Sequence, residues 1–265
     1  MREKGADFIV WLDPNTAKVQ GKTAVLGFRE VLRRFHVSLF IDARPMLMLT
    51  TSVSLLLITQ LVLGLAAYRR FWRGLFRVSG LRHQGRMRWG TWHRAAGLWS
   101  LPVLTVICLT GVLYFSETLG FTPPLPAAAD AALRDTVLPA GFDGAALDQA
   151  ATVAMSELPD LKVREIYFPV TKTESLHFRG DLDARLVRPR ANAVNVDPVT
   201  FAPLGVHRGQ DLGFDRRLVE AADPLHFGTW GGLTTQVIWV FSGLLASVLA
   251  ASGVRITSWR LSTSP

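Results

Sequence analysis

Three histidines each stand ahead of a long run of uncharged residues. The pairs are His36 with the run 46–68, His93 with the run 95–116, and His226 with the run 227–254. An imidazole is a common metal ligand and changes its charge near neutral pH. A histidine at a helix mouth is also often an interfacial residue that hydrogen-bonds lipid headgroups. For any one of these histidines alone, both interpretations stay open.

The uncharged runs are long enough to cross a membrane. A helix needs about 20 apolar residues to span the hydrocarbon, and none of the runs contains Asp, Glu, Lys or Arg. The sequence therefore predicts three transmembrane helices, at 46–68, 95–116 and 227–254. Ion and proton pathways usually place charged groups inside the bundle, so a secondary transporter is disfavoured. The Thr and Ser hydroxyls in the runs, Thr110 among them, are expected to hydrogen-bond between helices.

The segments that connect the spans differ in charge. The connection 69–94 contains eight arginines and no acidic residue, so the positive-inside rule predicts a cytoplasmic loop. Residues 117–227 contain 11 Lys or Arg and 16 Asp or Glu and are expected on the outer side. The N-terminal segment 1–45 is then outer as well, and the tail 255–265 is cytoplasmic. Because topology accounts for the net charge of +8, a nucleic-acid partner loses its main support.

One pattern of turn, histidine and span occurs twice. The turn motif D-P-x-T-x-x-x-x-G occupies residues 13–21 and 197–205, and each copy follows a strand-like apolar run. Each copy continues to a histidine, His36 or His226, and then to a span with a glycine near its inner end. Equivalent parts of a repeat should lie on the same side of the membrane, which agrees with the charges. We therefore expect His36 and His226 to lie together at the outer surface.

His93 belongs to a part of the repeat that occurs only once. It opens the span 95–116, which precedes the outer region and the second turn. If the unit is histidine and span, outer segment, turn, histidine and span, the first copy lacks its opening span. The chain then begins within a unit, which would explain an outer N-terminus without a signal-like apolar segment.

The outer region predicts a small α+β module. Residues 119–142 are rich in Ala, Pro and Gly and are typical of a linker. The next stretch fits an amphipathic helix with Leu147, Ala151, Met155 and Leu158 on one face. The segments VREIYFPV, ESLHFRGD and NAVNVDP are then expected to be strands. The predicted fold class is an all-α membrane bundle of three helices with an α+β domain that packs a helix on an antiparallel sheet.

These motifs resemble those of the PepSY-associated transmembrane proteins. The helix that ends in L-P, the strands and the V-D-P-x-T turn look like the PepSY module. TWHRAAGLW before a span that ends in TGVLYF, and PLHFGTWGG before the next span, resemble the span motifs of the family. The resemblance covers about residues 8–259 and implies a multi-pass protein of the bacterial inner membrane. That family is commonly encoded with iron-uptake genes and includes haem proteins that reduce ferric siderophores in the periplasm.

In the light of this resemblance, the histidines become candidate ligands of haem b. Imidazoles from two helices at one membrane depth hold the iron in b-type electron-transfer proteins. His36 and His226 are the predicted ligands of an outer haem near the periplasmic surface. His93, at the cytoplasmic end, is the predicted ligand of a second, inner haem whose other ligand belonged to the absent span. Small residues that leave room for a flat ligand lie nearby: Gly97, Gly228, Gly231 and Gly232.

The resemblance implies an inner-membrane haem protein that passes electrons from a cytoplasmic donor to a periplasmic ferric chelate, such as a siderophore. It would be an oxidoreductase in contact with membrane lipid. With the first span missing, either a partner chain would supply that span or the chain would keep only the outer haem. Typical members of the family have four or more spans, whereas this sequence predicts three. The alternative is a non-redox, membrane-tethered PepSY module that binds a periplasmic partner or restrains a protease, with interfacial histidines.

Overall fold

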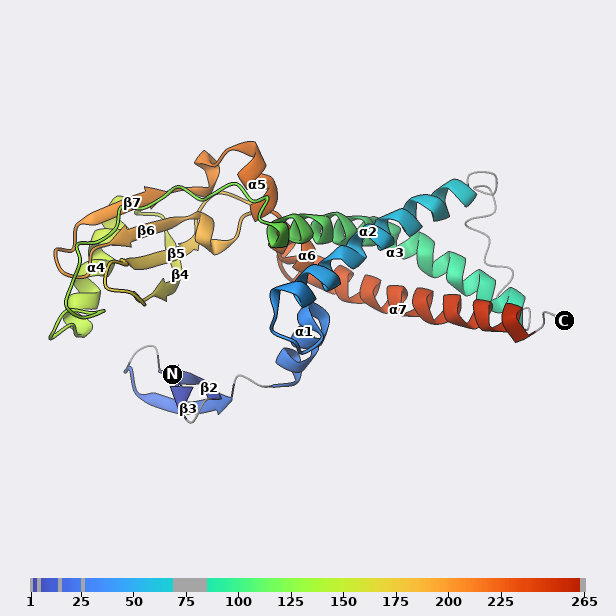
Figure 1. Ribbon diagram of the computed structural model, residues 1–265, viewed down its shortest axis with the longest axis horizontal. Helices are drawn as coiled ribbons and strands as arrows, with labels where there is room; N and C mark the ends of the chain where they lie inside the picture. The colour runs from blue at the N-terminus through green and yellow to red at the C-terminus, as the bar shows by residue number, and fades with distance from the viewer. Residues whose placement is uncertain (1, 4–5, 14–15, 25–26, 69–84, 263–265) are drawn as a thin grey trace.

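The computed structural model describes residues 2–3, 6–13, 16–24, 27–68 and 85–262. Three long helices form a bundle, and an α+β domain and a small N-terminal sheet lie toward one end of it (Figure 1). Most of the predicted basic loop 69–94, including His83, falls on residues 69–84 and lies outside the described residues.

The three long helices match the three predicted spans. They are α2 (Arg44–Tyr68), α3 (Arg86–Leu119) and α7 (Gly232–Ser262). The parts long and apolar enough to cross a membrane are Arg44–Ala67, Arg88–Leu119 and Thr229–Trp259, with mean hydropathies of 1.9 to 2.0. The predicted number of spans is confirmed. Helices α2 and α3 extend beyond their uncharged runs, whereas α7 begins five residues into its run, because Gly228 ends the short helix before it with a φ of 64°.

Helix α3 is the central helix of the bundle and packs against both α2 and α7. Val103 and Cys108 of α3 are buried, whereas Leu56 of α2 and Val240 of α7 are about two-thirds exposed. A Cβ added at Gly111 of α3 would lie 2.7 Å from the Cβ of Ser54, so the backbones of α2 and α3 approach closely there. Small residues at a helix interface are typical of membrane bundles.

The α+β domain consists of helix α4 (Gly144–Glu157) and a four-stranded antiparallel sheet. The strands lie in the order β4, β5, β6, β7 and span Lys162–Tyr167, Leu176–Asp181, Ala193–Val196 and Pro203–His207. Leu176 and Phe178 alternate with half-buried residues on β5 and point toward α4. The helix on an antiparallel sheet and its first three strands were predicted, and β7 adds a fourth strand.

The buried face of α4 overlaps the predicted one, since Leu147, Ala151 and Leu158 pack against the core and only Met155 does not. Ala150, Ala154 and Leu158 are almost completely buried against the sheet, whereas Met155 is 48% exposed. Positions 150, 154 and 158 also follow the spacing of one helix face. The small alanines are buried because they let the helix approach the sheet closely, and the larger methionine stays at the edge.

The predicted linker is irregular in structure but packed on the domain. It begins at Gly120, since α3 ends at Leu119. The backbone N–H of Ala129 donates to the carbonyl of Leu204 (3.0 Å) and that of Ala131 to the carbonyl of Thr173 (2.9 Å). The linker thus follows the sheet and does not separate the domain from the bundle.

The two copies of the D-P-x-T motif form the same turn. In both, the aspartate carboxylate accepts the N–H of the residue three positions on, from Thr16 (2.8 Å) and from Thr200 (3.0 Å). In both, the next residue has a positive φ, 53° at Ala17 and 56° at Phe201. The turns join β2 (Ala6–Leu12) to β3 (Val19–Ala24), and β6 to β7. The proposed repeat therefore extends to backbone conformation.

A short helix follows each copy and leads into a long helix. In the first copy this is α1 (Phe28–Ser38), which carries His36 and precedes α2. In the second copy, α5 (Phe214–Glu220) is followed by α6 (Ala222–Phe227), which carries His226 and precedes α7. The N-terminal sheet has the order β1, β2, β3, with β1 at Arg2–Glu3.

Candidate functional site

His36 and His226 lie next to each other at the end of the bundle that carries the α+β domain. Their ring centres are 6.2 Å apart, and the ring planes are inclined by 44°. Figure 1 shows α1 and α6 at this same end. His36 is exposed and His226 is half-buried. The structure therefore brings together two histidines that are 190 residues apart in the sequence.

The hydrogen bond of His226 to Thr110 determines which ring nitrogen is free. The Nδ1 atom of His226 lies 2.8 Å from the Thr110 hydroxyl oxygen. That hydroxyl has a single hydrogen, and it lies within donating distance of the carbonyls of Val106 (2.9 Å) and Ile107 (3.0 Å). With the hydroxyl hydrogen donated to one of these carbonyls, the hydroxyl oxygen accepts the Nδ1–H of His226. The Nε2 atom consequently carries the lone pair with which an imidazole binds a metal.

Aromatic rings enclose the His226 imidazole. The rings of Tyr114 and Phe227 are packed edge to face against it, with centres 5.2 Å and 5.6 Å away. Burial among these groups, with the nearby His36 as a smaller cause, lowers the pKa of His226 to about 4. His226 is therefore neutral at pH 7, which is the form in which an imidazole binds metal.

His93 lies toward the other end of the bundle, between α3 and α7. Its Nδ1 atom lies 3.1 Å from the carbonyl oxygen of Leu249 and 3.0 Å from the hydroxyl oxygen of Ser252. Because a carbonyl can only accept, Nδ1 carries the proton and Nε2 is free. His93 and Thr110 are 17 residues apart on α3, which corresponds to about 26 Å along the helix axis. The two histidine positions are thus separated by most of a bilayer.

The glycines near His226 play roles other than the predicted one. Gly228 ends α6 with a φ of 64°, and a Cβ there would lie 2.7 Å from the Trp239 ring. A Cβ at Gly231 would lie 2.5 Å from the Thr235 side chain. Side chains of the protein itself therefore occupy the space beside these two glycines. Gly232 alone of the three has open space around it.

Most membrane hydroxyls bond to their own helix. Thr51 and Thr105 donate to the carbonyls of Leu47 and Leu101, one turn earlier. The expectation of hydrogen bonds between helices is wrong for these two, because a carbonyl one turn earlier is always within reach of a helical threonine. Two threonines confirm the expectation: the bond of Thr110 to His226 joins α3 to α6, and the Thr50 hydroxyl of α2 donates to the carbonyl of Val37 in α1 (2.6 Å).

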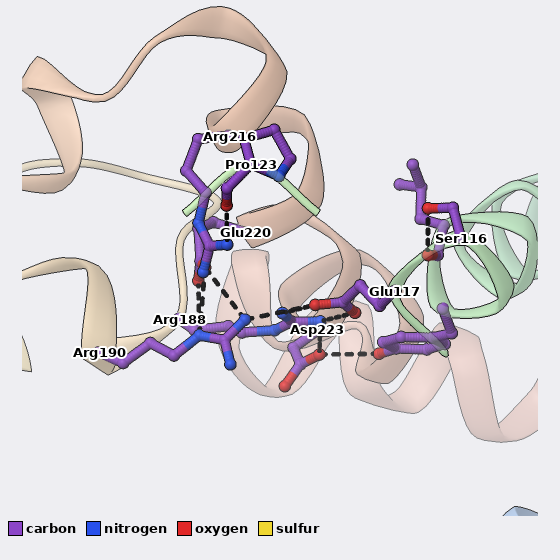
Figure 2. Close-up of polar contacts among 10 residues, drawn as sticks. Ser116, Glu117, Pro123, Arg188, Arg190, Arg216, Glu220 and Asp223 are labelled. Carbon is purple, nitrogen blue, oxygen red and sulfur yellow. Dashed lines mark hydrogen bonds and ion pairs between the residues drawn. The ribbon is translucent and has the colours of Figure 1, made fainter. Parts of the chain in front are cut away.

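A network of arginines and carboxylates joins the α+β domain to the bundle, as Figure 2 shows. Arg188 is 7% exposed and contacts both Glu117, at the end of α3, and Asp223, on α6. Arg190 and Arg216 contact Glu220, whose side chain is completely buried. Tyr114 donates a hydrogen bond to Asp223 (2.9 Å). The network therefore reaches the residues that surround His226.

Sequence reasoning missed several of these neighbours. Thr110 and Tyr114 are four residues apart on α3, and Asp223 and His226 are three apart on α6, so each pair shares a helix face. This spacing was a usable signal. For Arg188 the sequence contains no such signal, because Arg188 lies 71 residues from Glu117 in a connection between strands.

Among the described residues, no three or more His, Cys, Asp or Glu side chains are grouped as metal ligands. A search of curated proteins found no match. The sequence model of one family, described as the PepSY-associated TM region, matches residues 2–260. This match covers nearly the whole chain, both copies of the repeat included. The chain therefore belongs to the PepSY-associated transmembrane family.

Proposed function

We propose that the protein is a bacterial inner-membrane b-type haem protein that passes electrons to a periplasmic ferric chelate, such as a ferric siderophore. The observation that carries this proposal is the pairing of His36 with His226. Both histidines stand at equivalent positions of a repeat, and they come from separate helices at one end of the membrane bundle.

The distance between the two rings fits a single metal ion. If both imidazoles held one metal ion at about 2 Å through a ring nitrogen that lies roughly 1 Å from its own ring centre, the ring centres would be about 6 Å apart. The observed separation of 6.2 Å agrees with this value. The residues present are therefore compatible with a haem iron between His36 and His226.

The surrounding residues have supporting roles. Thr110 holds the Nδ1–H of His226, so the Nε2 atom is directed away from α3. Burial keeps the His226 imidazole neutral. Haem, when bound, would supply one-electron transfer. His93 is the candidate ligand of a second haem, about 26 Å away along α3 by its 17-residue separation from Thr110, where Leu249 holds its Nδ1–H.

The orientation in the membrane follows from the charges. The arginine-rich connection 69–94 is proposed to be cytoplasmic by the positive-inside rule. The α+β domain and the His36–His226 pair are then periplasmic, and His93 lies toward the cytoplasm. A cytoplasmic donor would supply electrons near His93, and the chelate would receive them near His36, whose imidazole is exposed. A partner chain with a further span could complete the inner site.

An absorption spectrum of the purified protein, expressed with adequate haem, tests the proposal. The expected result is a Soret band that shifts on reduction with dithionite. His36→Ala and His226→Ala should each remove the outer-haem signal. His177→Gln changes a histidine of strand β5 and serves as the control, in which the signal should remain.

The outcomes separate the two functional classes. A wild-type protein without a Soret band would overturn the redox function and leave a membrane-tethered module that binds a partner. Retention of the full signal in both His36→Ala and His226→Ala would refute the ligand assignment. A further haem that disappears only in His93→Ala would identify the inner site.

A further inference from the structure

Arg188 connects the α+β domain to two separate helices of the membrane bundle. It precedes the 3-10 turn Pro189–Ala191 between β5 and β6. Its two terminal nitrogens bond the two carboxylate oxygens of Glu117, at 2.8 Å and 2.9 Å. One of them also lies 2.7 Å from a carboxylate oxygen of Asp223. A planar guanidinium is suited to such a bidentate contact, which fixes orientation as well as distance.

Asp223 carries this contact to His226. The two residues are three positions apart on α6 and therefore share one face of that short helix. The Asp223 oxygen that contacts Arg188 also accepts the hydrogen bond of the Tyr114 hydroxyl. The Tyr114 ring is packed edge to face on the His226 imidazole. Two routes thus join Arg188 to His226, one through α6 and one through Tyr114.

Because Arg188 is buried, its positive charge depends on nearby carboxylates. The side chain is only 8% exposed, and its Nε atom has no hydrogen-bond partner among the described residues. Burial disfavours the charged guanidinium, but the contacts with Glu117 and Asp223 outweigh it and raise the pKa of Arg188. The arginine therefore stays charged, and its position depends on these carboxylates.

Arg190 joins the two parts of the network, because its terminal nitrogen lies 3.1 Å from Glu220 and 3.4 Å from Glu117. Arg190 and Arg216 both contact Glu220, which is completely buried at the end of α5. A buried carboxylate needs such partners simply to be tolerated. The ion pairs of these two arginines run to Glu220 and, for Arg190, also to Glu117. Arg188 is the arginine of this network that contacts the helix of His226.

We propose that Arg188 is a positioning residue for His226: by holding Asp223, it transmits the docking of the α+β domain to the His36–His226 pair. This inference rests on the proposed haem ligation. A change in the seating of the domain, for example when a chelate or partner binds it, would then alter the position and the electrostatic surroundings of the His226 imidazole.

The charges of Arg188 and Asp223 predict the direction in which each substitution changes the midpoint potential of the outer haem. Removing the positive charge of Arg188 leaves the Asp223 carboxylate uncompensated, which favours the more positive, ferric state of a nearby haem. Removing the negative charge of Asp223 has the opposite effect. Arg188→Gln should therefore lower the midpoint potential of the outer haem and Asp223→Asn should raise it. A merely structural loss would not give opposite signs.

The experiment measures this potential by dithionite titration of the detergent-purified protein. We expect each variant to change the reduction equilibrium about threefold to tenfold, where tenfold is about 59 mV for one electron. The double variant should lie nearer the wild type than either single variant. Arg188→Lys keeps the charge but loses the bidentate contact, so it should restore the potential while the exchange of α6 stays fast. Arg164→Gln is the matched control, because Arg164 pairs with Asp181 at the exposed edge of the sheet.

A second readout does not need haem. Backbone hydrogen exchange of α6 should become faster in Arg188→Gln and stay unchanged in Arg164→Gln. If the wild type binds haem and its potential is the same in Arg188→Gln, the positioning role is wrong. If the wild type binds no haem, the proposed function fails. In that case, hydrogen exchange of α6 still tests the contact between Arg188 and α6. Faster exchange in Arg188→Gln would support the contact, and unchanged exchange would overturn it.

Discussion

The Nδ1 atom of His226 lies 2.8 Å from the hydroxyl oxygen of Thr110, and this hydrogen bond joins the short helix α6 to the central helix α3. Thr110→Val keeps the shape of the side chain and removes the acceptor. Because the bond orients the imidazole, we expect about a 10- to 100-fold loss of haem affinity, as is usual when a partner of a ligating histidine is removed. Titration of the apoprotein with haem measures this loss of affinity.

Thr105→Val is the control for this change. Thr105 lies on the same helix, and its hydroxyl donates to the carbonyl of Leu101. Its replacement should leave haem affinity unchanged. If both variants lost haem affinity equally, the loss would come from a change in helix α3 and not from the missing hydrogen bond to His226.

Because α2 and α3 approach closely at Gly111, a larger side chain at this position should destabilise the bundle. A side chain there would overlap Ser54, whose Cβ lies 2.7 Å from the added Cβ position. Gly111→Leu should destabilise the bundle by about 1–3 kcal/mol, the usual cost of overpacking. Gly243→Leu places the same side chain on α7, where nothing lies within 4 Å, and should cost much less. Thermal unfolding in detergent compares the two, and similar melting temperatures would contradict this packing.

The same substitution in the two equivalent turns should lower the free energy of unfolding by different amounts. The carboxylate of Asp197 is nearly buried, at 3% exposure, and accepts N–H groups from Val199 (2.7 Å) and Thr200 (3.0 Å). Asp197→Ala should therefore lower the free energy of unfolding by about 1.5–3 kcal/mol, as expected for hydrogen bonds to a charged group. Asp13→Ala removes the same kind of bond at an exposed turn, where water can replace it. Equal losses of stability at the two turns would contradict the argument that burial sets the cost.

The α+β domain should lose stability in mild acid. Burial is the main cause that lowers the pKa values of His177 and His207 below the ordinary value of 6.5. Below pH 6.5, the unfolded chain binds protons that the folded domain resists, so the free energy of unfolding falls as the pH falls. Above that pH both states are neutral at these residues and the effect vanishes. Hydrogen exchange of β5 and β6 at pH 7.5 and pH 5.5, two values chosen on either side of the ordinary histidine pKa, should reveal the difference.

His177→Gln should reduce this pH dependence, because it removes one of the two titrating groups. The carboxylates of Glu174 and Asp197, whose pKa values are lowered by backbone N–H groups, act only at more acidic pH. If the variant kept the full pH dependence between these two values, another group would be responsible.

Several features of this protein follow from short stretches of sequence alone. An uncharged run of about 20 residues has no stable alternative to a helix in a membrane, so α2, α3 and α7 were predictable. The repeated D-P-x-T motif predicted two equivalent turns, because an aspartate carboxylate bonds to nearby backbone N–H groups. The equivalence of His36 and His226 followed from the same repeat.

Only the tertiary structure decided which residues surround those histidines. Arg188 meets Glu117 and Asp223 because the α+β domain is seated on the ends of α3 and α6, and no local spacing encodes that seating. The space beside Gly228 is filled because Trp239 turns toward it. Periodicity and turn chemistry determine local elements, whereas contacts between distant segments depend on how those elements pack against one another.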